Sequence, residues 1–296
     1  MNCSTPKKLN AWLILRAMVN DLKADRNIGD QLREIEQPHQ IALALIAYVV
    51  QQPKTWLLAH PETHLNKAQA EQLESMLLRL EAGEPLPYLF GKQEFFGLEF
   101  EVNPSVLIPR PETEMMVEAA LDWLQIHSSS RKGIDVGTGS GCIAISLVNN
   151  CPDLHMLATD LSSDALQVAE RNAQNHKTAD RINFALCDLL PENLQPVDLV
   201  CANLPYIPTA KLIEVNSLPW EPSLALDGGT GGLDLISKLL HSLPPFLNHP
   251  ALILLETETT LGTQTLQLAK NNFPDADVSL HKDLFDRDRM VKIELK

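Results

Sequence analysis

The alternation of apolar runs and helical stretches from Gly133 to the C-terminus most constrains the fold of this chain. Strands are expected at 133–136, 155–159, 182–187, 197–202, 251–256, 277–282 and 290–295. Helices at 142–149, 164–176 and 233–243 separate several of them, a pattern typical of a doubly wound α/β sheet with parallel strands. The short segment 283–289 leaves no room for a helical crossover, so the last two strands should pair antiparallel. We therefore predict six parallel strands and one reversed strand at the edge of the sheet.

The first 90 residues have a different pattern, with apolar residues at helical spacing in 11–22, 40–51 and 66–82. Alternating apolar residues in 94–109 predict a β-hairpin, and a helix should then open near Pro111 and Thr113 and run to about residue 126. The chain is thus expected to consist of a helical domain over 1–90, a hairpin linker over 91–109 and an α/β domain over 110–296.

Composition narrows the possible partners of the chain. Its formal net charge of −14 would repel a phosphate backbone, so nucleic acid is a disfavoured substrate. Its apolar runs are shorter than the roughly 20 residues that a membrane helix needs, and its start lacks the features of a signal peptide. The five cysteines have no CxxC spacing. We therefore expect a cytoplasmic protein with no metal and no membrane partner.

The segment after the first expected strand is a glycine-rich turn, Gly137-Thr138-Gly139-Ser140-Gly141, which lets the backbone approach a ligand closely. Asp135, Asp160 and Asp188 lie at the ends of three successive strands. Asp160 is placed to accept hydrogen bonds from ribose hydroxyls, and Asp188 to accept them from an adenine amino group. S-adenosylmethionine fits these acidic surroundings better than NAD, because its sulfonium and ammonium groups are cationic whereas a pyrophosphate is anionic.

The tetrapeptide Asn203-Leu204-Pro205-Tyr206 directly follows the fourth expected strand. It resembles the (N/D)PPY signature of amino-methyltransferases, with Leu204 in place of a proline. The Asn203 side-chain oxygen and the main-chain carbonyl of residue 204 can each accept one N–H of an incoming NH₂ group, which aligns its nitrogen for methyl transfer. Tyr206 can stack on a planar amide or base. Leu204 preserves the required backbone carbonyl but lacks the fixed φ of proline.

Further segments resemble the PrmC or HemK family of protein-glutamine N5-methyltransferases. The matching segments are 55–62, 87–91, 107–114, 221–229 and 287–291. The block Ile108-Pro109-Arg110-Pro111-Glu112-Thr113-Glu114 favours enzymes that modify release factors over those that modify a ribosomal protein. Leu255-Glu256-Thr257-Glu258 departs from the usual Leu-Glu-Ile-Gly.

This resemblance implies a Rossmann-like class I methyltransferase sheet of seven strands, the last antiparallel, with a small N-terminal helical domain and a β-hairpin linker. It implies that Gly137, Thr138, Gly139, Ser140, Gly141, Asp160, Asp188, Leu189 and Asn203 hold S-adenosyl-L-methionine. Asn203, Leu204, Pro205 and Tyr206 would hold the substrate glutamine, which lies in a Gly-Gly-Gln loop of peptide-chain release factors. The helical domain would dock the release factor, and Arg110 and Glu112 would either line the cofactor entrance or form an ion pair at a helix start.

Two other functions are compatible with these residues. The same tetrapeptide handles an exocyclic amine, so an adenine-N6 methyltransferase is possible, although the net charge and the lack of a basic aromatic-rich segment oppose it. The substitutions at Leu204 and Thr257 also suggest a cofactor-binding scaffold without catalysis. Retention of Asn203, Tyr206 and the strand-end aspartates argues against that alternative.

Overall fold

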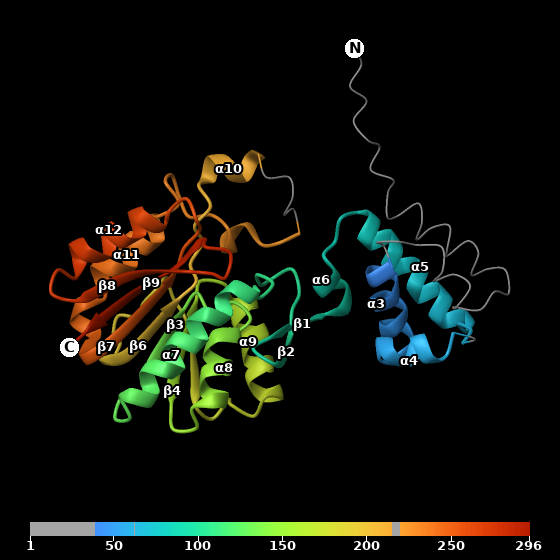
Figure 1. Cartoon of the computed structure of the whole chain (residues 1–296), viewed down its shortest axis with the longest axis horizontal. Coiled ribbons are helices and arrows are strands. Elements are labelled where there is room, and N and C mark those ends of the chain that lie inside the picture. Colours follow the sequence, from blue (N-terminus) through green and yellow to red (C-terminus); the bar gives the residue numbers. More distant parts are fainter. Residues whose placement is uncertain (1–38, 62, 215–219) are drawn as a thin grey trace, which may run out of the picture. The chain divides into compact units, whose positions relative to one another are not determined.

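The computed structural model describes residues 39–61, 63–214 and 220–296. The chain divides into two compact units between Phe90 and Gly91 (Figure 1). The helix expected over 11–22 lies outside the described residues.

The described part of the first unit is helical. Its helices are α3 (His39–Val50), α4 (Lys54–Ala59), α5 (Lys67–Glu81) and α6 (Leu86–Phe90). Leu45, Leu57 and Leu73 are buried together in its core. Helix α5 begins at Asn66, whose side chain accepts a hydrogen bond from the backbone N–H of Gln69 at 2.9 Å, while the Gln69 side chain accepts one from the backbone N–H of Asn66.

The second unit opens with a hairpin of β1 (Lys92–Phe95) and β2 (Leu98–Glu101), which lies within the segment 91–109. Its turn residues, Phe96 and Gly97, both have positive φ, as a tight two-residue hairpin turn requires. Phe95 and Phe100 are buried in the core of the second unit, so the hairpin is anchored to that unit by packing.

A seven-stranded sheet forms the centre of the second unit, in the order β5-β4-β3-β6-β7-β9-β8. Its strands are β3 (Lys132–Val136), β4 (His155–Asp160), β5 (Ile182–Leu186), β6 (Val197–Ala202), β7 (Leu247–Glu256), β8 (Asp277–Lys282) and β9 (Asp288–Leu295). Neighbouring strands from β5 to β7 pair parallel, and β9 is antiparallel to both β7 and β8. The prediction of seven strands with the last antiparallel is confirmed.

The position of the reversed strand was predicted wrongly, because β9 lies between β7 and β8 instead of at the edge. The reason is burial. Val291 and Ile293 of β9 are fully buried and need a strand on each side, whereas β8 has no fully buried residue and tolerates the edge.

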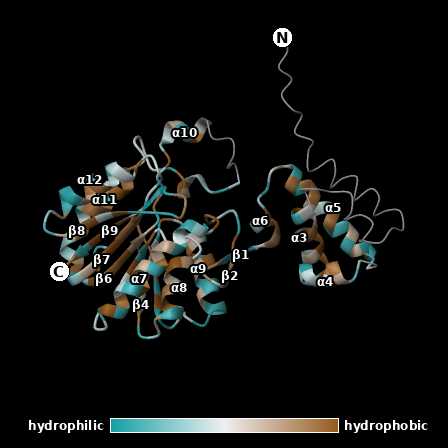
Figure 2. Ribbon diagram, viewed as in Figure 1, coloured by the Kyte–Doolittle hydropathy of each residue, from teal (hydrophilic) through white to brown (hydrophobic). Residues whose placement is uncertain are grey.

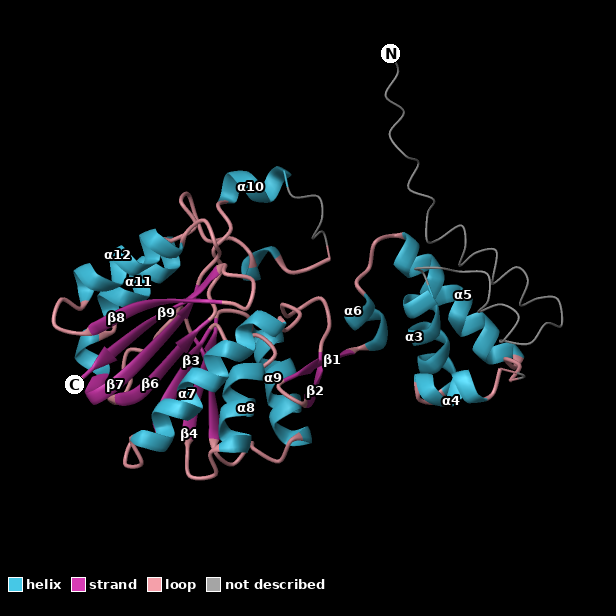
Figure 3. Ribbon diagram, viewed as in Figure 1, coloured by secondary structure: helices cyan, strands magenta, loops and turns pink. Residues whose placement is uncertain are grey.

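Helices cover both faces of this sheet (Figures 1 and 3). One face packs against α7 (Glu114–Ile126), α8 (Cys142–Asn150) and α9 (Ser163–Asn175), and the other against α11 (Asp234–Ser242) and α12 (Gly262–Asn272). The strands are correspondingly apolar along their length, as Figure 2 shows. Along β6, Leu199 and Cys201 face the first group of helices, and Val200 and Ala202 the second.

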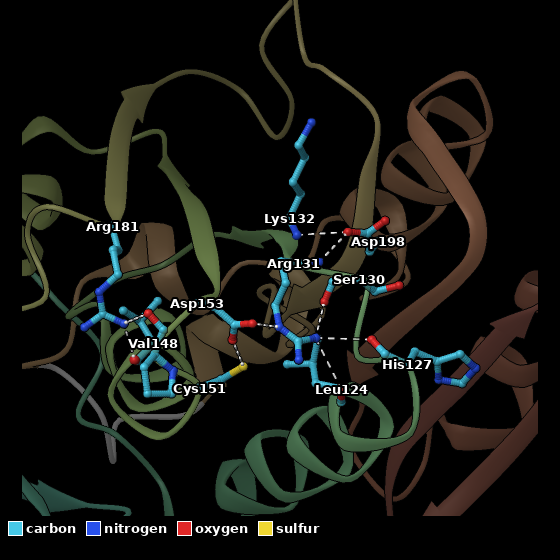
Figure 4. Close-up of polar contacts among 11 residues, drawn as sticks. Leu124, His127, Ser130, Arg131, Lys132, Val148, Cys151, Asp153, Arg181 and Asp198 are labelled. Atoms are coloured by element: carbon cyan, nitrogen blue, oxygen red, sulfur yellow. Dashed lines mark hydrogen bonds and ion pairs between the residues drawn. The ribbon is translucent and has the colours of Figure 1, made fainter.

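Charged groups at the amino ends of the central strands bind the loops there. Asp198 accepts hydrogen bonds from the backbone N–H groups of Arg131 and Lys132 at 2.8 and 2.9 Å (Figure 4). The Arg131 guanidinium donates to the carbonyl of Ser130 and pairs with Asp153. These charges are occupied in holding loops, and in sheets of this kind ligands bind at the opposite, carboxyl ends of the strands.

No helix in the described part of the chain is both long and apolar enough to cross a membrane.

Candidate functional site

A cavity lies at the carboxyl ends of β3, β4 and β6, with a volume of about 1030 Å³ when the adjoining open solvent is included. Ten of the predicted site residues line it: Gly137, Thr138, Gly139, Ser140, Asp160, Asp188, Leu189, Asn203, Leu204 and Pro205. Gly141 and Tyr206 are not among the lining residues. The sheet therefore brings together segments that are more than sixty residues apart in the sequence.

The glycine-rich turn needs its glycines for two different reasons. Gly139 has φ +55°, and a Cβ there would contact no atom within 4 Å, so its bare backbone borders free space in the cavity. Gly141 has φ +80° at the start of α8, where a Cβ would lie 2.9 Å from Cδ1 of Ile145. Gly139 thus leaves room for a ligand, whereas Gly141 permits the helix to pack closely.

Asp160, the last residue of β4, is fixed by the backbone around it. One carboxylate oxygen accepts the N–H of Gly139 and the other the N–H of Ser162, both at 2.9 Å. Burial raises the pKa of Asp160, and the backbone hydrogen bonds oppose that shift. Each carboxylate oxygen retains further acceptor capacity and the residue lines the cavity, which suits recognition of a pair of ribose hydroxyls.

Asp135 lies under the glycine-rich turn and is fully buried. Its Oδ2 accepts hydrogen bonds from Thr138 Oγ1 at 2.6 Å and from the Ala144 N–H at 3.3 Å. Its Oδ1 has no partner among the described residues, and burial raises the pKa of the carboxyl to about 6. Ser140 Oγ, in the cavity lining, is likewise buried without a partner. Such orphaned polar atoms fit a site that is completed by a bound, partly cationic group.

Asp188 and Leu189 follow the end of β5 at the rim of the cavity. The Asp188 carboxylate pairs with Nζ of Lys238, on α11, at 2.5 Å, and both side chains are about half exposed. Leu189 has φ +65°, and its carbonyl accepts a hydrogen bond from Thr159 Oγ1 at 2.8 Å. This left-handed backbone conformation, which a leucine rarely adopts, thus lies in a segment that lines the cavity. Sequence reasoning missed Lys238, which no local motif marks.

Leu204 makes a packing contribution that a motif comparison does not reveal. Its side chain is buried in the core on the α11 side of the sheet. A Cβ on Gly137 would lie 3.0 Å from Cδ2 of Leu204, so the leucine side chain supports the glycine-rich turn directly. The leucine that replaces the proline therefore links the tetrapeptide 203–206 to the glycine-rich turn through this contact.

The main chain after Pro205 is held by the segment 221–232. Ile207 donates its N–H to the Leu226 carbonyl at 3.0 Å and accepts the N–H of Gly228 at 2.8 Å. A Cβ on Gly228 would lie 2.7 Å from Cα of Tyr206, so only glycine allows this contact. Burial raises the pKa of Tyr206, whose hydroxyl therefore stays protonated.

Arg110 lines the cavity. One of the two sequence-based alternatives was an ion pair between Arg110 and Glu112 at a helix start, and the two side chains do not form it. Its guanidinium binds Glu221 at 2.5 Å, and Glu221 also accepts the Ile108 N–H at 3.1 Å. Glu112 instead faces Arg289, at 3.7 Å. The prediction of an ion pair at the helix start is therefore wrong, because Glu221 pairs with Arg110 from a segment distant in the sequence.

Sequence reasoning also missed a buried polar network behind Asn203. The Asn203 amide nitrogen donates to Thr113 Oγ1 at 3.2 Å, and Thr113 Oγ1 donates to Glu256 Oε2 at 2.6 Å. Thr113 was expected to help start helix α7, but its side chain caps no backbone group there. Glu256 ends β7 and is 6% exposed, and burial raises its pKa to about 7. A buried carboxylate at a strand end was the signal that could have identified it.

Comparisons with known proteins agree with this geometry. Residues 26–91 match the PrmC N-terminal domain family, and residues 113–215 match the methyltransferase small domain family. The chain is 40% identical to the release factor glutamine methyltransferase of Moorella thermoacetica over 241 residues, which cover 80% of this chain and 84% of that protein. It is 36% identical to the enzyme of the same name from Coxiella burnetii, over 81% of this chain and 86% of that protein.

Two further similarities are more limited. The chain is 32% identical to a bifunctional methyltransferase of Rickettsia bellii over 88% of its own length, but it spans 52% of that protein. The hMettl16 catalytic domain, solved in complex with a MAT2A 3′UTR hairpin, superimposes with a TM-score of 0.54 and 17% identity over 77% of this chain and 82% of that one. That likeness is one of fold.

The folded sheet, the cavity at its carboxyl edge and the extent of these matches lead to one conclusion. This chain belongs to the release factor glutamine methyltransferase family.

Proposed function

We propose that the chain transfers a methyl group from S-adenosylmethionine to the side-chain amide nitrogen, N5, of the glutamine in the Gly-Gly-Gln loop of peptide-chain release factors. The observation that carries this proposal is the position of Asn203. Its carboxamide lies in the wall of a cavity that is also lined by the glycine-rich turn and Asp160, with its nitrogen held by Thr113.

S-adenosylmethionine, when bound, supplies an electrophilic methyl group on a sulfonium. The backbone around Gly139 would approach it closely, Asp160 would accept its ribose hydroxyls, and Asp188 and Leu189 would border its adenine. Gly141 supports the turn from beneath, outside the cavity lining. The negative potential of buried Asp135 favours the cationic end of the cofactor.

The substrate amide requires two acceptors, because its NH₂ group presents two protons. We assign these roles to Asn203 Oδ1 and the main-chain carbonyl of Leu204, which would fix the nitrogen in line with the methyl group. Pro205 lines the cavity beside them. Tyr206 is proposed to stack on the amide plane; because it is not among the residues that line the cavity, this contact requires its ring to turn toward the substrate.

The helical unit, 1–90, is proposed to dock the release factor, and the second unit, with the hairpin of 91–109 and the α/β sheet of 110–296, to carry the chemistry. The match of residues 26–91 to the PrmC N-terminal domain family supports this division. Since release factors work at the ribosome, the proposal places the reaction in the cytoplasm.

Nucleic acid is the competing substrate, because adenine N6 also presents an NH₂ group. The formal charge of −14 opposes it, since phosphate backbones are bound through excess lysine and arginine. A ribosomal-protein glutamine is a second competitor. The names of the relatives from Moorella thermoacetica and Coxiella burnetii favour release factors over both.

A labelling experiment separates these functions. Purified protein incubated with methyl-labelled S-adenosylmethionine should label a release factor that contains Gly-Gly-Gln, and replacement of that glutamine by alanine should abolish the signal. An adenine-containing oligonucleotide and a ribosomal-protein preparation serve as competing acceptors. Labelling that persists in the alanine variant, or that goes to a competing acceptor, contradicts the proposal, and binding of the cofactor without any transfer identifies a scaffold.

A further inference from the structure

The hydroxyl of Thr113 decides the orientation of the Asn203 carboxamide. A threonine hydroxyl has one proton to donate, and an ionised carboxylate can only accept. The contact of 2.6 Å between Thr113 Oγ1 and Glu256 Oε2 therefore uses the proton of Thr113. The Thr113 oxygen is left as an acceptor, so the atom of Asn203 that faces it at 3.2 Å must be the amide nitrogen.

The other end of the carboxamide follows from this assignment. Because the amide nitrogen is held on the side of Thr113 and Glu256, Oδ1 lies on the opposite side of the planar group. No donor within the described ranges reaches Oδ1, and Asn203 lines the cavity. Oδ1 is thus a free acceptor in the place where the proposed function needs one.

We propose that Thr113 and Glu256 are positioning residues that hold Asn203 with its carboxamide oxygen toward the substrate amide, and that a proton on Glu256 releases this orientation and stops transfer. The proposal rests on the proposed function, which assigns the gripping of the substrate to Asn203 Oδ1. Thr113 lines the cavity and Glu256 lies beyond it, and both would act through the orientation of Asn203.

Protonation of Glu256 would reverse the chain of hydrogen bonds. A neutral carboxyl can donate its proton to Thr113 Oγ1, and the Thr113 proton is then free to bind the oxygen of Asn203. The carboxamide would turn over and present NH₂ to the NH₂ of the substrate, so that two donors would face each other. The substrate amide would lose one of its two acceptors.

The surroundings of Glu256 allow this proton to bind near neutral pH. Burial raises the pKa of Glu256 to about 7, Thr113, Arg289 of β9 and Asn203 favour the charged form, and Glu112 opposes it. Tyr206 and Cys142 also face the carboxylate, but burial raises the pKa of both, so they stay neutral in this range. Asp135 titrates at about 6 next to Cys142, so a variant of Glu256 is needed to separate the two carboxylates.

Turnover of matched variants gives the kinetic test. Thr113→Val should lower kcat by about tenfold to a hundredfold, the scale of a misplaced transition-state hydrogen bond, with binding of S-adenosylhomocysteine unchanged. Thr113→Ser should rescue most of the loss. Thr265→Val is the control, because Thr265 is equally buried and hydrogen-bonds to Thr257 outside the site. It should lower stability without lowering kcat.

A spectroscopic test works even if no transfer is observed. In protein labelled with ¹⁵N-asparagine, the side-chain NH₂ signal of Asn203 is identified by its absence in Asn203→Ala. Between about pH 5.5 and 8.5 this signal should titrate with a midpoint near 7, and the titration should vanish in Glu256→Gln.

The outcomes distinguish this inference from the proposed function. If wild-type protein transfers no methyl group but the NH₂ signal titrates with Glu256, the proposed function fails and the positioning network stands. Wild-type kcat in Thr113→Val, or an Asn203 signal that does not change with pH, would overturn the inference while leaving the methyltransferase intact. Should Glu256→Gln fail to fold, the Thr113 and Thr265 variants still decide the matter.

Discussion

Asn203 is the residue on which the proposed chemistry depends most. We expect Asn203→Ala to bind S-adenosylhomocysteine with nearly wild-type affinity but to turn over about a hundredfold more slowly, because an acceptor used in the transition state is lost. Calorimetry measures the binding and labelled methyl transfer the turnover. Near-normal turnover would remove Asn203 from its proposed role.

Leu204 shows how a residue that departs from a motif can still be required. Because its side chain is 3% exposed and supports the glycine-rich turn, Leu204→Ala should destabilise the second unit by about 2–4 kcal/mol. The control is Leu284→Ala, since Leu284 is fully exposed. Urea denaturation of both variants measures the effect, and equal stabilities would mean that Leu204 does not carry the packing described above.

The sequence alone indicated many residues of this site but not the hydrogen bonds and ion pairs that join their side chains. The glycines, Asp160 and Asn203 could be predicted because each lies at the end of a strand or in the short segment that directly follows one. Thr113 and Glu256 could not, because their roles depend on a contact between residues 143 positions apart. The partner of Arg110 was unpredictable for the same reason, as Glu221 is 111 positions away.

At the scale of elements, the glycine-rich turn offers a matched pair of variants. Gly139 and Gly97 have φ of +55° and +71°, and a Cβ at either would contact nothing within 4 Å. Alanine at each position should therefore cost a similar free energy of unfolding, about 1 kcal/mol. Gly139 lines the cavity, whereas Gly97 lies in the hairpin turn.

Only Gly139→Ala should interfere with the cofactor, because its new methyl group would occupy the cavity. We expect a loss of S-adenosylhomocysteine affinity of about tenfold or more in Gly139→Ala and none in Gly97→Ala. Isothermal titration calorimetry gives both affinities. Equal affinities would show that the cofactor does not approach the turn at Gly139.

The strands themselves were predictable because β3, β4 and β6 are short segments rich in apolar residues that alternate with helical stretches, and their observed bounds differ from the expected ones by at most one residue. The order of the strands at the β8 edge of the sheet was not predictable. A local pattern states that β8 and β9 pair, but it does not state which of them lies against β7. That choice depends on the burial of Val291 and Ile293, which becomes visible once β7 is in place.

At the scale of the whole molecule, two buried carboxyls should make stability depend on pH. Burial raises the pKa of Asp135 to about 6 and that of Glu256 to about 7, above their values in the unfolded chain. The stability that they contribute is therefore present below about pH 4 and is lost as the pH rises through 6 and 7. Hydrogen bonds lower the pKa values of three other carboxyls, those of Asp153, Asp227 and Asp283. The stability that these three contribute is lost instead at the acidic end of the pH range.

We therefore expect the melting temperature to be higher near pH 5 than near pH 8, by a few degrees. Calorimetric scans across this range measure it. Glu256→Gln should reduce the fall, whereas Glu118→Gln, at an exposed position on α7, should leave it unchanged. A melting temperature that rises steadily toward pH 8 would mean that neither buried carboxyl titrates as described. If the melting temperature falls toward pH 8 as expected, stability favours the acidic end of the range and catalysis the basic end, since transfer requires Glu256 ionised.

The central claim is that the molecule methylates a glutamine side chain of a release factor, and tandem mass spectrometry tests it most directly. After incubation with S-adenosylmethionine, the peptide that contains Gly-Gly-Gln should gain the mass of one methyl group, and its fragments should place that group on the glutamine side-chain amide. The Asn203→Ala variant should leave the peptide almost unmodified. A methyl group on any other residue, or none on this peptide while another acceptor is methylated, would contradict the account.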